Sequence, residues 1–259
     1  MTSLQGLKIA GVIPARFAST RFPGKPLVEL CGKPLLQWVI EGARQSSKIS
    51  ELFVATDNSE IAKLSEKCGV RAVVTSVHCQ TGSDRIFETL NILKNENKIF
   101  DVVLNIQGDE PLINHTLIDP LADAFLQNTH LDMATLSHPL SVDDVENKNA
   151  VKVLLNKNSE AIYFSRFGIP FSRVKFEKNK YDECVQKHIG LYGFTTAFLK
   201  KLCEEPQTAI EKSESLEQLR ALHLGAKIKV ISVPQAIQGI DTPEDLIQFE
   251  KLYNKGLSK

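Results

Sequence analysis

The sequence lacks any run of about 18 uninterrupted apolar residues, the length at which a segment becomes a candidate membrane-spanning helix. It also lacks a basic N-terminal segment followed by an apolar stretch, so we expect no signal peptide. Net charge is missing too, because 31 Lys and Arg residues balance 31 Asp and Glu residues, which gives no reason to expect nucleic acid as a partner. We therefore expect a cytoplasmic protein without membrane insertion, in which any anion site comes from local clustering of basic residues.

Cysteine is scarce and scattered. The five cysteines form no CxxC pair and no Cys/His spacing typical of zinc. A chain of 259 residues buries enough surface to be stable without disulfides. We therefore expect reduced thiols, which agrees with a cytoplasmic location.

Short apolar runs alternate with amphipathic stretches through the first half of the chain. Strands are predicted over 9–13, 52–55, 71–74 and 102–106, and helices over 35–43, 59–68, 83–95 and 116–127. The helix over 83–95 begins at Ser83, a plausible N-cap. Such alternation is typical of a mostly parallel sheet with helices on both faces.

The second half has more strands and fewer long helices. Strands are predicted over 151–155, 161–164, 189–194 and 228–233, with one helix over 213–224 and another that opens at 241–243. We therefore predict a single α/β domain over residues 1–259, built on a doubly wound, mostly parallel sheet. A smaller lobe with a mixed or antiparallel sheet is inserted at about 140–225.

A basic loop, VIPARFASTRFPGKPL at residues 12–27, directly follows the first predicted strand. Open α/β sheets bind ligands at the carboxyl ends of their strands. The loop places three cations, Arg16, Arg21 and Lys25, within ten residues, and it matches neither the Walker A nor the dinucleotide motif. Three cations among backbone N–H groups suit a polyphosphate, while a solvated basic loop without a ligand is the alternative.

An acidic segment, NIQGDEP at residues 105–111, follows the strand predicted over 102–106. It places Asp109 and Glu110 just beyond the strand end. A carboxylate facing the basic loop at this edge would hold Mg²⁺ through oxygen ligands. An ordinary acidic turn is the alternative.

Nine segments occur in the order seen in one enzyme family. They are VIPARFASTRFPGKPL, ATD (55–57), QTGSDR (80–85), NIQGDEP, NAVKVL (149–154), YFSR (163–166), KHIGLYGF (187–194), LEQLRAL (216–222) and GIDTPEDL (239–246). Through them the chain resembles the CMP-Kdo synthetases, the 3-deoxy-manno-octulosonate (Kdo) cytidylyltransferases of lipopolysaccharide biosynthesis, from about residue 8 to 250. The nucleotide segments are shared with CMP-sialate synthetases, whereas YFSR, HIGLYGF and LEQLR are more specific.

The resemblance implies a fold of the nucleotide-diphospho-sugar transferase type and a Mg²⁺-dependent enzyme that forms CMP-Kdo and pyrophosphate from CTP and Kdo. It also implies a homodimer built through the smaller lobe. Two alternative hypotheses remain. One is a glycosyltransferase, although Asp109 does not lie in the DxD motif of that class. The other is a catalytically inactive nucleotide-binding regulator.

The family's site residues carry over position by position. The nucleotide contacts are Ala15, Arg16, Ser19, Arg21, Lys25, Gly82, Ser83 and Arg85. The Mg²⁺ ligands are Asp109 and Asp241, 132 residues apart, and Arg16 and Lys25 join them as catalytic residues. The sugar-acid contacts are Gln107, Arg166, His188, Tyr192, Glu217 and Gln218. Arg166 is the expected partner of the sugar carboxylate, because its planar fork binds a carboxylate bidentately.

Several of these residues have an ordinary structural alternative. Taken singly, His188 reads as a structural histidine and Tyr192 as a core residue, while Glu217 and Gln218 read as a solvated helix face.

The second nucleotide segment departs from HQSGTER, a frequent form in the family: Thr81, Ser83 and Asp84 are mild changes, whereas Cys79 replaces a histidine and so removes a titratable donor. Relatives that activate the 8-amino analogue of Kdo also lack this histidine, so the resemblance implies Kdo with the 8-amino analogue as the alternative, and another keto-sugar acid, such as a nine-carbon sialic acid, as a less favoured one.

Overall fold

The computed structural model describes residues 6–18, 22–128, 130–171, 173, 184–234 and 239–256. The chain divides into two compact units. The first unit contains the described residues of Lys8–Asp119 and Ile237–Lys259. The second contains those of Met1–Leu7 and Pro120–Ala236, so the lobe predicted at about 140–225 falls inside it and stays a prediction.

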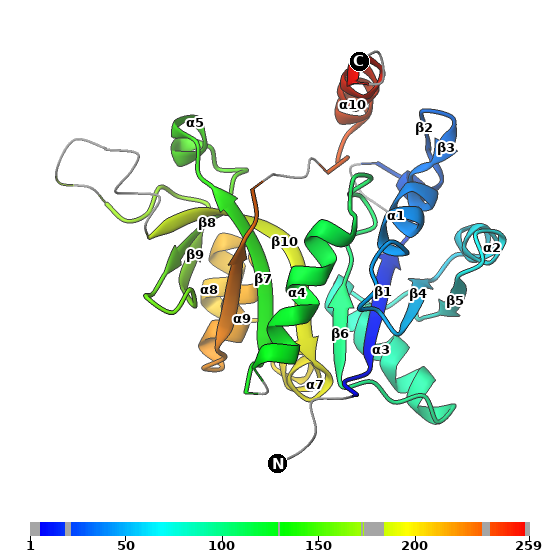
Figure 1. Cartoon of the computed structure of the whole chain (residues 1–259), viewed down its shortest axis with the longest axis horizontal. Helices are drawn as coiled ribbons and strands as arrows, with labels where there is room; N and C mark the ends of the chain where they lie inside the picture. The colour runs from blue at the N-terminus through cyan, green and yellow to red at the C-terminus, as the bar shows by residue number, and fades with distance from the viewer. Residues whose placement is uncertain are drawn as a thin grey trace. The chain divides into compact units, whose positions relative to one another are not determined.

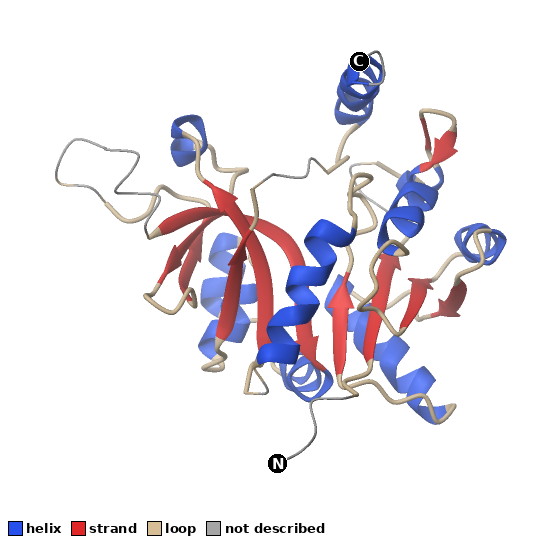
Figure 2. Cartoon of the chain, in the orientation of Figure 1, coloured by secondary structure: helices blue, strands red, loops and turns tan. Residues whose placement is uncertain are grey.

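The first unit is built on a parallel sheet (Figures 1 and 2). Its strands, in spatial order, are β6 (Val102–Asn105), β1 (Ile9–Ala15), β4 (Glu51–Thr56) and β5 (Arg71–Val74). Each neighbouring pair is parallel. Apart from Pro14, which is partly exposed, the residues of β1 and β6 are buried, as expected of a parallel sheet covered on both faces. The predicted α/β class and these four strands are confirmed.

The helices predicted in the first unit are confirmed, and a short helix lies within the basic loop, where none was predicted. The helices are α1 (Leu35–Ala43), α2 (Ser59–Lys67), α3 (Gly82–Asn95), α10 (Pro243–Gly256) and the short η1 (Lys25–Leu27). A two-stranded ribbon of β2 (Glu29–Leu30) and β3 (Lys33–Pro34) lies between η1 and α1 in the chain, and α4 (His115–Gln127) contains the point of division. The N-cap predicted at Ser83 is wrong, because Thr81 caps α3 and shares a capping box with Asp84.

The C-terminal helix α10 packs on the early part of the chain. Ile240 and Phe249 form one buried apolar cluster with Leu30 and Leu35, and further rings lie against it. The rings of Trp38 and Tyr253 meet edge to face with centroids 5.2 Å apart. This cluster anchors residues 239–256 to the first unit.

The second unit contains a mixed sheet (Figure 1). Its strands are β11 (Ile228–Ser232), β7 (Met133–Pro139), β10 (Val185–Thr195), β8 (Lys152–Leu155) and β9 (Ala161–Ser165). β7 pairs in parallel with β11 and antiparallel with β10, and β8 pairs antiparallel with β10 and β9. The mixed sheet was predicted, but β7 was not, because its sequence MATLSHP has neither strict alternation nor a long apolar run.

The helices of the second unit are short. They are α5 (Val142–Glu146), α7 (Thr196–Glu204), α8 (Ala209–Glu214) and α9 (Gln218–His223). The single helix predicted over 213–224 is wrong, because Ser215 adopts a left-handed conformation with φ 54° and ends α8. In the part of the chain that the structure describes, no helix has the length and apolar character needed to cross a membrane.

Candidate active site

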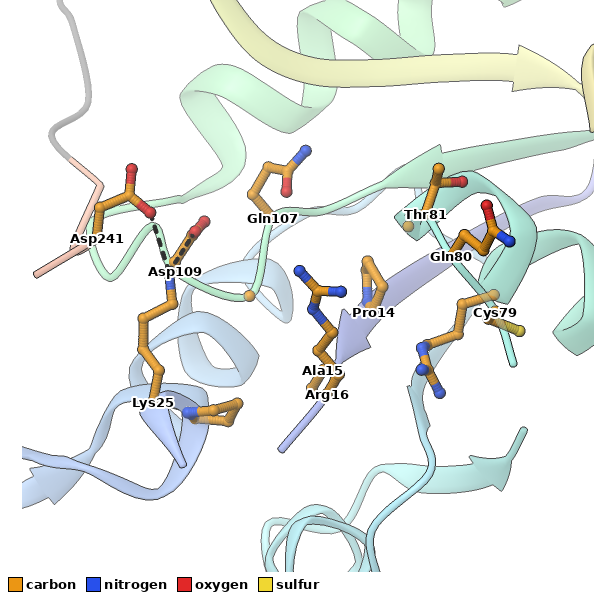
Figure 3. Close-up of a pocket in the computed structure, with 14 residues that line it drawn as sticks. Pro14, Ala15, Arg16, Lys25, Cys79, Gln80, Thr81, Gln107, Asp109 and Asp241 are labelled. Atoms are coloured by element: carbon orange, nitrogen blue, oxygen red, sulfur yellow. Dashed lines mark hydrogen bonds and ion pairs between the residues drawn. The ribbon is translucent and has the colours of Figure 1, made fainter. Parts of the chain in front are cut away.

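A pocket of about 280 Å³ lies in the first unit, beyond the carboxyl ends of β1 and β6 (Figure 3). Its walls come from the β1 end, η1, the start of α3, the loop after β6 and the segment before α10. The lining residues are Pro14, Ala15, Arg16, Lys25, Pro26, Cys79, Gln80, Thr81, Gly82, Arg85, Gln107, Gly108, Asp109 and Asp241. The pocket therefore lies where open α/β sheets usually bind their ligands, beyond the carboxyl ends of the strands.

Two carboxylates distant in sequence converge on one ammonium group in this pocket. Lys25 Nζ donates to Asp109 Oδ2 at 2.7 Å and to Asp241 Oδ1 at 3.3 Å, as Figure 3 shows. The Lys25 side chain is only 13% exposed. Asp109 and Asp241 thus share a cation position, although 132 residues separate them.

Hydrogen bonds hold the segments that carry the two carboxylates in place. The N–H of Ile240 donates to the carbonyl of Asp109 at 2.8 Å, which brings the Asp241 segment beside the loop after β6. Asp241 precedes the N-terminus of α10, where Asp245 Oδ2 accepts from the N–H of Asp241 and of Thr242. The burial of Ile240 keeps this segment on the first unit.

Two glycines allow the loops to approach one another. Gly24 precedes η1 with φ 69°, a conformation that glycine adopts without strain, and so sets the direction of the chain into Lys25. Gly108 lies against β1: a Cβ on it would come within 3.0 Å of the Pro14 carbonyl oxygen. The absence of a side chain at residue 108 therefore favours the close approach of the loop carrying Asp109 to the end of β1.

The N-terminus of α3 forms part of the pocket wall. Thr81 and Gly82 line the pocket, and α3 is 14 residues long. Such a helix end favours bound anions through its N–H groups and dipole. Ser83 is buried, at 1% exposure, and does not line the pocket, so its predicted nucleotide contact remains a prediction.

Arg85 lines the pocket while its guanidinium is engaged inside the protein. It donates to Asp57 Oδ2 at 2.7 Å and to Thr75 Oγ1 at 2.6 Å. Asp57, the last residue of the ATD segment, therefore fixes this cation, a role that the sequence reading did not assign. A buried ion pair with a second hydrogen bond makes Arg85 a rigid part of the wall.

Neighbouring ionisable groups have shifted pKa values. Burial, together with the charge of Asp109, raises the pKa of Glu110 to about 8, so this carboxyl is largely protonated at neutral pH. Only Asp109 of the acidic pair lines the pocket. Burial and a hydrogen bond to Glu88 raise the pKa of the Cys79 thiol to about 12, which keeps the thiol protonated and unreactive.

The basic loop is only partly covered by the described residues. Arg16 lies at the pocket and is exposed, and Ala15 at the end of β1 is buried in the pocket wall. Ser19 and Arg21, both predicted nucleotide contacts, lie outside the described residues, as does Thr20. The pocket therefore combines the cations Arg16, Lys25 and Arg85 with two carboxylates.

The carboxylates of Asp109 and Asp241 are suitable ligands for Mg²⁺. Within residues 6–18, 22–128, 130–171, 173, 184–234 and 239–256, no group of three or more His, Cys, Asp or Glu side chains is arranged to bind a metal. Two carboxylates that already share a cation suit Mg²⁺, which proteins often bind through one or two carboxylates plus substrate phosphates and water. Asp109 and Asp241 match that pattern.

Five of the six predicted sugar-acid contacts belong to the second unit, whereas Gln107 lines the pocket of the first. His188 lies on β10, where its Nε2 is 2.9 Å from Thr135 Oγ1. The Thr135 hydroxyl is also 2.8 Å from the carbonyl oxygen of Leu191, at a point where β10 shifts register. Burial lowers the pKa of His188 to about 3, so its imidazole is neutral, and the Tyr192 ring lies 5.4 Å away.

Glu217 and Gln218 lie at the start of α9. Glu217 accepts from Arg220 Nη2 at 3.2 Å, and Arg220 also binds Glu211 bidentately at 2.8 and 2.9 Å. Gln218 is 4% exposed, and its Nε2 has no hydrogen-bond partner among the described residues. Both side chains are thus more buried than the solvated helix face that was the alternative.

Comparisons with known proteins agree with this geometry. The family described as Cytidylyltransferase matches residues 10–228. A 3-deoxy-manno-octulosonate cytidylyltransferase from Bdellovibrio bacteriovorus is 53% identical over 247 residues, which cover 95% of this chain and 98% of that protein. One from Thermodesulfovibrio yellowstonii is 46% identical over 248 residues, with 94% and 97% covered. The solved structure of CMP:2-keto-3-deoxy-manno-octonic acid synthetase complexed with CTP is 34% identical, covers 96% of this chain and 99% of that one, and gives a TM-score of 0.87.

Proposed function

This chain belongs to the family of 3-deoxy-manno-octulosonate cytidylyltransferases, and from this premise we propose how it forms CMP-Kdo from CTP and Kdo. The C2 hydroxyl oxygen of Kdo forms a bond to the α-phosphorus of CTP and gives up its proton. The bond from that phosphorus to the bridging oxygen breaks, and pyrophosphate leaves. The observation that carries the assignment to this pocket is the meeting of Lys25, Asp109 and Asp241 beside the N-terminus of α3.

The protein's part in this reaction is charge neutralisation and positioning, since no covalent intermediate is needed. The N-terminus of α3 and the cations Arg16 and Lys25 bind the triphosphate. The same two cations stabilise the negative charge that develops on the leaving pyrophosphate. Ser19 and Arg21, in the same loop, add further contacts according to the family pattern.

We assign the metal site to Asp109 and Asp241. Their carboxylates hold Mg²⁺, which when bound offsets phosphate charge and lowers the pKa of the attacking hydroxyl. The support is that both carboxylates reach one cation position, at present that of the Lys25 ammonium group. Glu110 is not assigned as a ligand, because it does not line the pocket.

The sugar acid is held by residues of the family pattern. Arg166 binds the carboxylate, while Gln107, His188, Tyr192, Glu217 and Gln218 contact the rest of the sugar. His188 enters as a neutral imidazole, because of its lowered pKa. It therefore exchanges hydrogen bonds with sugar hydroxyls and carries no charge.

Pyrophosphate release with each nucleoside triphosphate tests the assignment. The acceptors are Kdo, its 8-amino analogue and a nine-carbon sialic acid, each with Mg²⁺. CTP with Kdo should give the fastest release. Release with another nucleotide, and none with CTP and either octulosonate, would overturn the function. Faster release with the 8-amino sugar would change only the identity of the acceptor.

We also propose that the enzyme is a cytoplasmic homodimer whose product serves lipopolysaccharide biosynthesis. Five free thiols fit a reducing compartment. Large apolar side chains on and just after β9 are exposed in the single chain: Ile162 at 52%, Phe167 at 68% and Phe171 at 87%. Exposed apolar groups of this size favour an interface, and a second copy of this chain is the partner that the family implies.

A further inference from the structure

The backbone of Arg166 is held on both sides by charged side chains of the second unit. Its N–H donates to Glu214 Oε2 at 2.9 Å, and its carbonyl oxygen accepts from Lys152 Nζ at 2.6 Å. Arg166 directly follows β9, so it lies outside the strand ladder that would otherwise fix its backbone. The Glu214 carboxylate and the Lys152 ammonium group fix the backbone of Arg166 instead.

Lys152 is the more unusual of the two, because it is completely buried. Its ammonium group donates to three backbone carbonyls, those of Arg166, Ala150 at 2.7 Å and Asn147 at 3.0 Å. Burial lowers the pKa of Lys152, and an apolar residue would avoid that desolvation cost. All three N–H bonds of the ammonium are used to hold the 147–150 loop against Arg166.

Glu214 orients the side chain of Arg166 as well as its backbone. Its carboxylate also accepts from Ser165 Oγ at 2.6 Å, and its own carbonyl oxygen accepts from Arg166 Nε at 2.9 Å. Glu214 ends α8, and Ser215 then turns the chain toward Glu217. One residue therefore ties the end of β9 to the segment that carries two predicted sugar contacts.

These contacts leave one edge of the Arg166 guanidinium open. Nε is engaged by Glu214 and Nη1 by the carbonyl of Lys148 at 3.3 Å. Among the described residues, Nη2 donates no hydrogen bond. The Nη1–Nη2 edge still has N–H groups in the fork geometry that a carboxylate binds with both oxygens.

We propose that Lys152 and Glu214 are positioning residues that hold Arg166 with this edge presented to the carboxylate of the sugar acid. The inference rests on the proposed function, since that function supplies the carboxylate. Neither residue touches the substrate. They reduce the freedom of a long side chain before the substrate binds, and such preorganisation lowers the cost of binding.

Steady-state kinetics of two variants test this role. Glu214→Gln and Lys152→Met should each raise KM for Kdo about tenfold, because a small misplacement of a substrate-positioning group is costly. KM for CTP should stay within about twofold of the wild-type value, since CTP does not use Arg166. Glu204→Gln and Lys201→Met, the same changes at exposed positions of α7, are the matched controls and should leave both constants unchanged.

A second substrate separates positioning from general damage. The C1 amide of Kdo lacks the carboxylate charge, so the wild type should use it much less efficiently than Kdo. Arg166→Met should lose that preference and Glu214→Gln should lose part of it. An unchanged preference and KM for Kdo in folded Glu214→Gln, or equal losses for both substrates, would overturn the proposal.

Thermal unfolding identifies variants that do not fold. Ser165→Ala, which removes the hydroxyl that donates to Glu214 and accepts from the N–H of Phe167, then replaces Glu214→Gln. A wild-type protein that releases no pyrophosphate from CTP and Kdo would instead refute the proposed function.

Discussion

At the scale of single residues, the pocket of the first unit is a set of compensated charges. Lys25 lies between Asp109 and Asp241, and Arg85 is paired with Asp57 behind the wall. Without these partners, like charges at the pocket would repel one another and destabilise the fold. These paired charges also suit the proposed ligands: a divalent cation can replace Lys25 beside the two carboxylates, and a polyanion can replace the carboxylates beside Lys25.

Asp109→Asn should reduce nucleotidyl transfer at least about 100-fold, because it removes one of two charged metal ligands. The fold should survive, since the Asp109 side chain is 29% exposed and the amide keeps its shape. Pyrophosphate release during a Mg²⁺ titration and a thermal unfolding curve measure the two effects. Asp143→Asn, an exposed position on α5, is the control. Near-normal activity of Asp109→Asn would contradict the metal assignment.

His188 should make stability depend on pH. Its pKa is about 3 in the folded chain, below the ordinary value of 6.5, because burial disfavours the charged form. The unfolded chain therefore binds more protons between these values, and stability falls as pH drops from about 6.5 toward 3. At pH 5 the loss from this group is at most about 2 kcal/mol.

Urea unfolding of the wild type and of His188→Gln at pH 7 and pH 5 measures this dependence. The variant has no imidazole to protonate, so its unfolding free energy should fall less between the two pH values. Equal losses in the two proteins would show that His188 is accessible to protons in the folded state.

At the scale of elements, helix ends supply both stability and binding. α3 and α8 each begin with a threonine in a capping box, Thr81 with Asp84 and Thr208 with Glu211. Thr81 also lines the pocket, whereas Thr208 lies in the second unit. The two helices therefore begin with the same capping structure, but only α3 is predicted to contact the nucleotide.

Thr81→Ala and Thr208→Ala should each lower the unfolding free energy by about 1 kcal/mol, the usual effect of losing an N-cap side chain. Only Thr81→Ala should also raise KM for CTP, because it loosens the helix end proposed to bind phosphate. Denaturant unfolding and initial-rate kinetics give the two numbers. An equal change in KM for CTP in both variants would argue against phosphate binding at α3.

At the scale of the whole molecule, the proposed homodimer should show in the mass of the protein in solution. Light scattering should give twice the 28.8 kDa of one chain. Phe167→Asp should shift the mass toward the monomer, because it puts a charge on the apolar surface of the second unit. Ile99→Asp, an equally exposed apolar position of the first unit, should not. A monomeric wild type would refute the dimer.

The sequence by itself determined the elements whose causes are local. α1 was predicted over the residues it occupies, and β1, β4, β5 and β6 were predicted from short strand-like runs, because periodicity and strand length are local properties. The capping pattern of Thr81 with Asp84 is also present in the sequence, although the prediction placed the N-cap at Ser83. The order of the nine segments was enough to identify the family, which the comparisons confirm.

Tertiary structure alone decided what depends on distant residues. β7 is a strand because β10 and β11 pair with it, and the predicted helix over 213–224 is divided by a single left-handed residue at Ser215. No local pattern could show that Lys25 bridges Asp109 and Asp241. Their meeting requires the packing of α10 on the first unit and the hydrogen bond from Ile240 to Asp109, and such contacts form only when the whole unit folds.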